Sequence, residues 1–347
     1  MEAPHPAAKI LVPLEDAAIA QGRAPYASLY KELAAQLKPL SAAQAHSSLP
    51  YLGFVTPAFT AFQAKLRLSA AVRGLADEHA FQQGSEKFRK LSKTLPFKPR
   101  FISYSDPATG YRLPATGYRL PATAFSKKPQ SDEDAELLLT IAAAWAWLKR
   151  RKIPGLEEAN FTLLEAYEEA QAALAATAAE QAIRNIVAPL LAECVAGERS
   201  YEGLLAQLSS PDKVWGIPGK LTPQAHMDIA YRTATATAYN HARVDYGMNP
   251  QLAAGLPGGQ LLVTMDERTS DICRPLAGLY VPRELILTGL FVPPFHFNCR
   301  TAFAWVSALD WPDDPAQYIS PYYWSGTEPK ATIQEGFGRF VSALWAA

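Results

Sequence analysis

The stretch "TPQAHMDIAYRTATATAYNHAR", residues 222–243, decides the fold. Thr222 can cap a helix and Pro223 suits the first helical position, so the pattern predicts a helix from Pro223 to about Tyr246, ended by Gly247. Four side chains fall at i, i+4, i+7 and i+11 and therefore share one face of this helix: Arg232, Ala236, Tyr239 and Arg243. A face with two arginines and a tyrosine can join the helix to a neighbouring part of the fold.

A compact unit of short strands and loops is expected after this helix. The segment QLLVTM, residues 260–265, is typical of a strand, and residues 260–310 alternate short apolar runs with turn residues. Residues 308–347 are rich in proline and tyrosine, and we expect them to pack along the surface or on a neighbouring molecule.

The chain before residue 220 is expected to be mainly helical. Residues 1–50 are rich in alanine and proline with short helical patches, such as SLYKELAAQL from Ser28, and are interpreted as an arm with little core of its own. Helices are predicted from Pro57 to about Lys93, over 131–152, and, as two or three helices, over 156–206. Pro189 falls inside the last region and predicts a kink or a boundary there.

A tandem repeat separates two of these helical regions. The heptapeptide ATGYRLP occurs at 108–114 and again at 115–121, and its prolines and glycines predict an extended loop. The sequence therefore predicts an α+β protein with a mainly helical N-terminal two-thirds, a small C-terminal α+β domain and extended terminal arms. Its expected parts are consecutive: 1–50, 51–130, 131–220, 221–307 and 308–347.

Composition restricts the class of protein. The 347 residues carry 33 basic and 33 acidic side chains, whereas free-standing nucleic-acid-binding proteins usually have a basic surplus. Three cysteines are too few for a disulfide framework and fit assembly in a reducing cytoplasm. The N-terminus lacks the pattern of a secretory signal, and the most apolar stretch, Leu137–Leu148, is too short to span a bilayer. We therefore expect no membrane partner.

Three blocks within residues 228–303 resemble the Mu F-like family of phage minor head (head-morphogenesis) proteins. The blocks are YRTATATAYNHAR, with Arg232, Thr233, Tyr239, Asn240 and Arg243; DERTSDICRPLAG, with Asp266, Arg268, Thr269, Cys273, Leu276 and Gly278; and VPPFHFNCRTAF, with Pro293, Pro294, His296, Asn298, Cys299 and Arg300. Residues 56–81 are more loosely similar to the N-terminal part of such proteins. The three blocks within residues 228–303 form a specific signature of the family only together, through their order and spacing.

This resemblance implies a protein that is made during head assembly in the host cytoplasm and stays in the virion in few copies. Its implied partner is the portal protein, the major capsid protein or both, and contact with packaged DNA is left open. The resemblance implies no enzymatic activity and no cofactor, and it implies that residues 221–307 form a Mu F-like domain.

Cys273, His296 and Cys299 are the residues with the most reactive chemistry. As metal ligands they would provide two thiolates and an imidazole, with Asp266 or Asp271 as a fourth ligand, which suits zinc. As a catalytic pair, a cysteine would need a lowered pKa and a histidine within hydrogen-bond reach. In the interpretation that we favour, the cysteines are small core residues and His296 makes structural hydrogen bonds.

Comparison with the Mu F-like family, which the chain resembles, leaves the metal interpretation open. Some relatives have a cysteine at the position of Ser270 and another at the position of Thr301, and this chain has neither. We expect no metal and no catalytic residue, with zinc as the open alternative.

A structural polar network is the favoured role of the motif residues. Arg300 can bind a carboxylate through two parallel hydrogen bonds, and Asp266 is the expected partner. Arg232 and Arg243 would extend this pair into a buried network that joins helix to sheet. The predicted set is Arg232, Tyr239, Asn240, Arg243, Asp266, Arg268, Thr269, His296 and Arg300.

Two basic stretches, residues 87–100 and 149–152, have two interpretations. The favoured one is a solvated helix surface, and the other is contact with the phosphates of packaged DNA. In the second case the candidate residues are Lys87, Arg89, Lys90, Lys93, Lys98 and Arg100.

Two classes of function follow. The favoured one is a structural virion protein, a minor head protein that acts in capsid assembly at the portal or inner capsid and in genome packaging or ejection. The alternative is an enzyme packaged in the head, either a metal-dependent hydrolase or nuclease, or an ADP-ribosyltransferase-like effector that uses Arg232, Thr269 and Ser270, with Glu284 as the nearest acid. A scaffolding protein that is lost from the mature particle is a lesser possibility.

Overall fold

The computed structural model describes residues 6–84, 161–210, 222–319 and 333–344. These residues form two compact units, each assembled from segments far apart in the sequence. The bundle unit comprises residues 18–67, 165–210 and 222–235, and the sheet unit comprises residues 6–17, 68–84, 161–164, 236–319 and 333–344. The units differ from the five consecutive parts expected from the sequence because long helices contribute residues to both.

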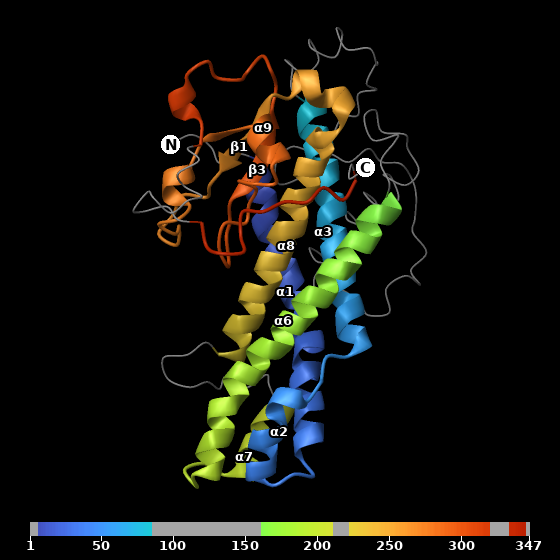
Figure 1. Ribbon diagram of the computed structural model, residues 1–347, viewed down its shortest axis with the longest axis vertical. Helices are drawn as coiled ribbons and strands as arrows, with labels where there is room; N and C mark the ends of the chain where they lie inside the picture. Colours follow the sequence, from blue (N-terminus) through green and yellow to red (C-terminus); the bar gives the residue numbers. More distant parts are fainter. Residues whose placement is uncertain (1–5, 85–160, 211–221, 320–332, 345–347) are drawn as a thin grey trace. The chain divides into compact units, whose positions relative to one another are not determined.

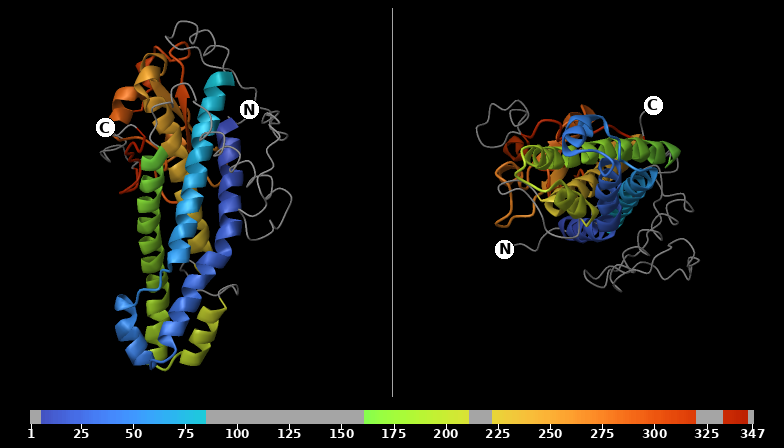
Figure 2. Two further views of the ribbon diagram at one scale, coloured as in Figure 1. Left: turned by 90° about the vertical axis from the view of Figure 1, so that its right-hand side faces the viewer. Right: turned by 90° about the horizontal axis from the view of Figure 1, so that it is seen from below.

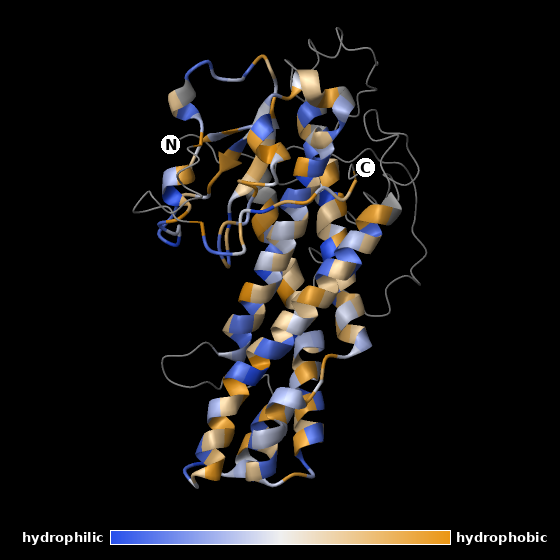
Figure 3. Ribbon diagram, in the orientation of Figure 1, coloured by the Kyte–Doolittle hydropathy of each residue, from blue (hydrophilic) through white to orange (hydrophobic). Residues whose placement is uncertain are grey.

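Six helices supply the bundle unit in whole or in part: α1 (Pro6–Leu37), α2 (Ala42–Ser48), α3 (Pro57–Gly84), α6 (Phe161–Val195), α7 (Tyr201–Ser209) and α8 (Pro223–Met248). Figure 2 shows α2 and α7 on opposite sides of the parts of α1 and α6 that belong to this unit. Hydrophilic and hydrophobic residues alternate along α6 and α8 (Figure 3). α6 buries one face, whereas residues 238–247 of α8 are buried all round. The helices predicted for the described residues between 57 and 246 are confirmed.

The N-terminal segment corrects the sequence analysis, because it is a long helix and not an arm with little core. α1 runs through Pro13 and Pro25, two of the prolines of the segment that was expected to be an arm. Leu29, Leu33 and Leu37 lie four residues apart and are fully buried. Burial of this apolar stripe offsets the backbone hydrogen bonds that the two prolines remove.

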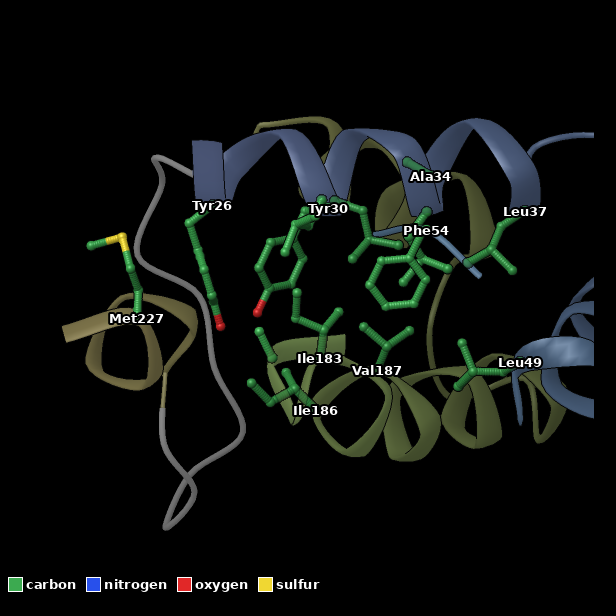
Figure 4. Packing of buried hydrophobic residues seen from close by; sticks show 14 of the residues in the cluster. Tyr26, Tyr30, Ala34, Leu37, Leu49, Phe54, Ile183, Ile186, Val187 and Met227 are labelled. Carbon is green, nitrogen blue, oxygen red and sulfur yellow. The ribbon is translucent and has the colours of Figure 1, made fainter. Parts of the chain in front are cut away.

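The core of the bundle unit joins α1 to α6. Figure 4 shows Tyr30 of α1 facing Ile183 and Val187 of α6, with Phe54, from the segment before α3, between the two helices. Tyr26 packs against Tyr30 with ring centroids 5.6 Å apart. Each large apolar side chain buried in this way stabilises the unit by about 1.5–3 kcal/mol.

Local sequence signals fix several helix ends. Ser41 and Gln44 form a capping box at the start of α2, and Ser200 caps α7 through Gly203 N. Thr222 Oγ1 accepts a hydrogen bond from Ala225 N at 3.1 Å, so its predicted capping role at α8 is confirmed. α6 continues through Pro189, and the boundary considered there is absent.

The sheet unit contains an antiparallel three-stranded sheet in the order β2-β1-β3. Its strands are β1 (Gly258–Leu262), β2 (Tyr280–Pro282) and β3 (Ala302–Val306), and the short helices are α9 (Arg283–Leu287), η3 (Pro250–Gly255), η4 (Arg274–Leu276) and η5 (Pro315–Gln317). Figure 1 shows β3 beside the second half of α8. The expected class, a mainly helical α+β protein with short C-terminal strands, is confirmed for the described residues.

The helices of the sheet unit pack closely. A Cβ atom added to Gly74 of α3 would lie 2.3 Å from the backbone oxygen of Tyr239 in α8. Only glycine allows this approach, which brings the next turn of α3, with Asp77 and Glu78, against α8. The contact positions the polar groups described below.

The C-terminal residues belong to the sheet unit. Ile319 N donates to Tyr280 O at 2.8 Å, and Phe340 N donates to Gly289 O at 2.9 Å. Asp245 of α8 accepts hydrogen bonds from Ser342 Oγ and from Ala343 N. The described part of the expected tail therefore packs on its own chain.

Several predicted features lie outside the described residues: the ATGYRLP repeat, the helix over 131–152, both basic stretches and residues 85–93 of the first predicted helix. No helix in the described part of the chain is both long and apolar enough to cross a membrane.

Candidate metal centre

The three sequence blocks meet in the sheet unit. Asn240 of α8 donates through Nδ2 to Thr301 O at 3.1 Å and accepts through Oδ1 from Phe303 N at 2.9 Å. The first block is thereby attached to the third. Arg300 of the third block binds Asp266 of the second at 2.6 Å and 2.5 Å, so the expected pairing is confirmed.

Helix side chains bind the outer edge of β3. Besides Asn240, Glu78 accepts a hydrogen bond from Trp305 N at 3.3 Å, and Gln82 donates one to Trp305 O at 2.9 Å. An edge strand exposes N–H and C=O groups without a partner strand, and such groups are costly when buried. Asn240, Glu78 and Gln82 therefore take the place of a fourth strand.

Cys273, His296 and Cys299 come together in the same unit. The Sγ atom of Cys273 lies 3.0 Å from His296 Nε2 and 3.5 Å from Cys299 Sγ. All three potential ligand atoms lie within 4.8 Å of one another. Both cysteines are buried and unoxidised, and His296 is half-buried. Two sulfurs and an imidazole nitrogen in this arrangement form a potential ligand set for a soft divalent ion.

Neighbouring groups orient this cluster. His296 Nδ1 lies 2.6 Å from Phe297 O, and because a carbonyl only accepts, Nδ1 carries the hydrogen and Nε2 faces the cysteines. Ser270 Oγ lies 2.7 Å from Nε2 and accepts from Cys273 N. Thr301 Oγ1 donates to Cys273 Sγ at 3.2 Å.

The thiols are electrostatically coupled. Burial raises the pKa of Cys299, but hydrogen bonds with Cys273 and His296 and the charge of His296 outweigh burial and hold that pKa well below its usual value. The hydrogen bond with Cys299, followed by burial, raises the pKa of Cys273. Cys299 is fully buried, however, so its thiolate is poorly placed to attack a substrate.

A shallow hollow opens beside the cluster. Ser270, Cys273 and His296 reach it together with Asn298 and Arg300, and it has room for about one water molecule. Pockets for organic ligands are typically about 300–1,000 Å³. The hollow suits an ion or a water molecule better than an organic substrate.

The Asp266–Arg300 pair sits on a tight turn. Asp266 Oδ1 accepts from Arg268 N at 2.9 Å, and Thr269 Oγ1 accepts from Asp266 N and donates to Thr264 O. The hydrogen bond from Arg300 holds the pKa of Asp266 far below its usual value. The Asp266 side chain is 37% exposed, which corrects the expectation of a buried pair. The reason is that the turn lies at the surface.

Arg243 and Tyr239 belong to a second, separate cluster. Arg243 pairs with Glu78 at 2.6 Å and donates to Tyr239 OH, which donates to Asp77. Both charged partners of the pair are fully buried. The predicted single network joining these residues to Asp266 and Arg300 is therefore wrong, since their face of α8 packs on α3.

The remaining predicted residues are dispersed. Arg232 belongs to the bundle unit, and Arg268 is 72% exposed and 4.0 Å from Asp266. Glu284 is exposed on α9. The six candidate DNA-contacting residues, Lys87 to Arg100, lie outside the described residues.

Sequence reasoning missed Glu78 and Gln82. A signal for Glu78 was available, because Asp77, Glu78 and His79 follow one another in an otherwise apolar part of α3. Three consecutive residues span about 200° of a helix surface, so at least one polar side chain of a largely buried helix must face the protein. Gln82, one turn later, continues the same face.

Comparison with known proteins gives no match: no family model fits the chain, and no curated protein or solved structure is significantly similar to it.

Proposed function

We propose that the chain is a structural component of a phage head, a minor head protein whose residues 221–307 act as a Mu F-like module. The proposal rests on the three motif blocks named above. The observation that carries it is that Asn240 of the first block binds Thr301 O and Phe303 N of the third. Asn240 thereby occupies the outer edge of β3, which begins inside the third block. The motif residues thus serve to hold the sheet unit together.

The contacts of the other motif residues support the same role. Asp266, Thr269 and Arg300 bind one another or the backbone of their own turn, and Tyr239 and Arg243 bind α3. Catalytic groups usually converge on a cavity that admits a substrate. Here the motif side chains are mostly directed at other protein groups, which favours a structural role.

The test is to measure the copy number of the chain in purified particles. Quantitative mass spectrometry would be applied to mature virions and to DNA-free heads of the phage that encodes it. We expect few copies, in the same ratio to the major capsid protein in both. Presence in DNA-free heads alone would identify a scaffolding protein, and absence from both would contradict any structural role.

A metal-dependent hydrolase is the second candidate, and one observation favours it. Cys273, His296 and Cys299 are three ligands beside a hollow that can hold a water molecule, which resembles a catalytic zinc site with an open position. Its test is cleavage of plasmid DNA by zinc-supplemented protein. Cleavage that is lost in Cys299→Ser but kept in Cys194→Ser would favour this candidate over the structural one.

A further inference from the structure

The Cys273–His296–Cys299 cluster joins two segments that are separate in the chain. Cys273 ends the turn that begins near Thr264, while His296 and Cys299 lie on the loop that leads into β3. The two segments also meet through Asp266 and Arg300. A metal ion bound by both cysteines would link the two segments inside the sheet unit.

We propose that Cys273 Sγ, Cys299 Sγ and His296 Nε2 bind a divalent ion of the zinc class, with Ser270 Oγ or a water molecule at the fourth position. This site is independent of the structural function proposed above, since a head protein can fold with or without a metal. The hydrolase candidate, in contrast, rests on the same three residues.

The distances fit this assignment. Tetrahedral zinc, with Zn–S bonds of about 2.3 Å and Zn–N bonds of about 2.0 Å, places two sulfurs about 3.8 Å apart and a sulfur and a nitrogen about 3.5 Å apart. The observed separations are 3.5 Å for Cys273 Sγ to Cys299 Sγ and 3.0 Å for Cys273 Sγ to His296 Nε2. An outward movement of a few tenths of an ångström makes room for the ion.

The surroundings of the ligands also fit. A histidine that binds a metal commonly donates its other N–H to a carbonyl, as His296 Nδ1 does to Phe297 O. Thr301 Oγ1 donates a hydrogen bond to Cys273 Sγ, which suits ionised sulfur. The two cysteines come from separate segments and meet only in the folded chain, so ion binding and folding of the sheet unit are coupled.

Ser270 determines which fourth ligand the ion has and therefore how tightly it is bound. Its Oγ atom is 2.7 Å from His296 Nε2 and lines the hollow, so it stands where a fourth ligand would be. A hydroxyl is a weaker zinc ligand than a thiolate. Ser270→Cys should therefore add a third thiolate and tighten binding, whereas Ser270→Ala should leave a site that water completes.

The experiment measures metal in the full-length protein, purified under reducing conditions without chelators from zinc-supplemented cells. Elemental analysis should find about one zinc per chain. Cys273→Ser, Cys299→Ser and His296→Gln should each lose most of it. Cys194→Ser is the matched control, because Cys194 is a buried cysteine of the bundle unit far from the cluster in sequence, and it should retain the zinc.

Cobalt substitution gives a readout that does not depend on variants that fail to fold. Co²⁺ bound to thiolates has intense charge-transfer absorption that grows with the number of sulfurs, so Ser270→Cys should exceed the wild type. Chelation of the wild type should lower its melting temperature on the order of 5 °C, and added zinc should restore it. Wild-type protein without zinc or the cobalt signature, or equal loss in Cys194→Ser and Cys299→Ser, would overturn the proposal. Failure here would leave the particle measurement above unaffected.

Discussion

Asp266 and Arg300 form a two-point ion pair whose acid is more than one-third exposed. Solvent screens such a pair, so Arg300→Ala should lower the free energy of unfolding by only about 1 kcal/mol. Urea denaturation would measure the change. Arg268→Ala is the control, since Arg268 is 72% exposed and should have almost no effect. A loss of several kcal/mol for Arg300→Ala would mean that the pair is buried in solution.

The same pair makes stability depend on acid. The pKa of Asp266 is lower in the folded chain than its unfolded value of about 3.9, because Arg300 stabilises the carboxylate. Its contribution is therefore complete above about pH 4 and is lost as the pH falls toward the folded pKa. Unfolding curves of the wild type and Asp266→Asn should converge at acidic pH. A difference that stays constant down to pH 2 would contradict this cause.

Glu78 and Arg243 should behave differently because both are fully buried. Arg243→Met leaves the Glu78 charge without its partner and should cost about 3–5 kcal/mol. The double variant Arg243→Met with Glu78→Gln removes both charges and should recover part of that loss, as a double-mutant cycle would reveal. Strictly additive losses would show that the two side chains do not interact.

At the residue level, the sequence could predict an ion pair when both of its members belong to the motif blocks. The pairing of Arg300 with Asp266 followed from their chemistry, but its exposure did not, because exposure depends on where the turn lies in the folded chain. The partner of Arg243 was not predictable from the motifs, since Glu78 is more than 160 residues away in the sequence.

The side-chain amide of Asn240 joins helix α8 to strand β3, because it binds both Thr301 O and Phe303 N. Asn240→Ala leaves two buried backbone groups without these bonds and should cost about 2–4 kcal/mol. Hydrogen exchange should show faster loss of the Phe303 amide in the variant. Asn185→Ala is a matched control, since Asn185 binds only Gln181 on the exposed side of α6. Equal exchange rates of the Phe303 amide in Asn240→Ala and the wild type would contradict the edge role.

Two helical glycines should respond in opposite directions to alanine. Gly74→Ala would bring Cβ to 2.3 Å from Tyr239 O and should destabilise the sheet unit by about 1–3 kcal/mol. Gly203 in α7 has ordinary space around it, with the nearest atom at 3.4 Å, so Gly203→Ala should stabilise by up to about 1 kcal/mol. Thermal melts of both variants test this, and a stabilising Gly74→Ala would show that α3 and α8 are less closely packed.

At the level of elements, periodicity and proline or capping signals predicted the starts of α3 at Pro57 and of α8 after Thr222. Residues 156–206 were predicted only as two or three helices, so the start of α7 after Ser200 was not located. The same rules failed for α1, where the alanine- and proline-rich composition of residues 1–50 suggested an arm with only short helical patches. The apolar stripe of Leu29, Leu33 and Leu37 stabilises that helix through tertiary burial, which local propensity does not include.

At the level of the whole molecule, the sequence predicted the mainly helical α+β class but not the two compact units. α1, α3, α6 and α8 each contribute to both units, so no composition change marks a boundary along the chain. The C-terminal residues near Phe340 similarly complete the sheet unit through hydrogen bonds to segments many residues earlier. Contacts of this range depend on the three-dimensional fold.

The proposal that concerns the whole molecule is that the sheet unit is a structural module of a phage head. Its most direct test is an unsymmetrised reconstruction of the mature virion of the phage that, on this proposal, encodes the chain, centred on the portal vertex. We expect density for the three-stranded sheet and the second half of α8 in contact with the portal protein or the inner capsid surface. A well-resolved portal vertex and inner capsid without this density, in particles from which the chain is also absent by mass spectrometry, would contradict the claim.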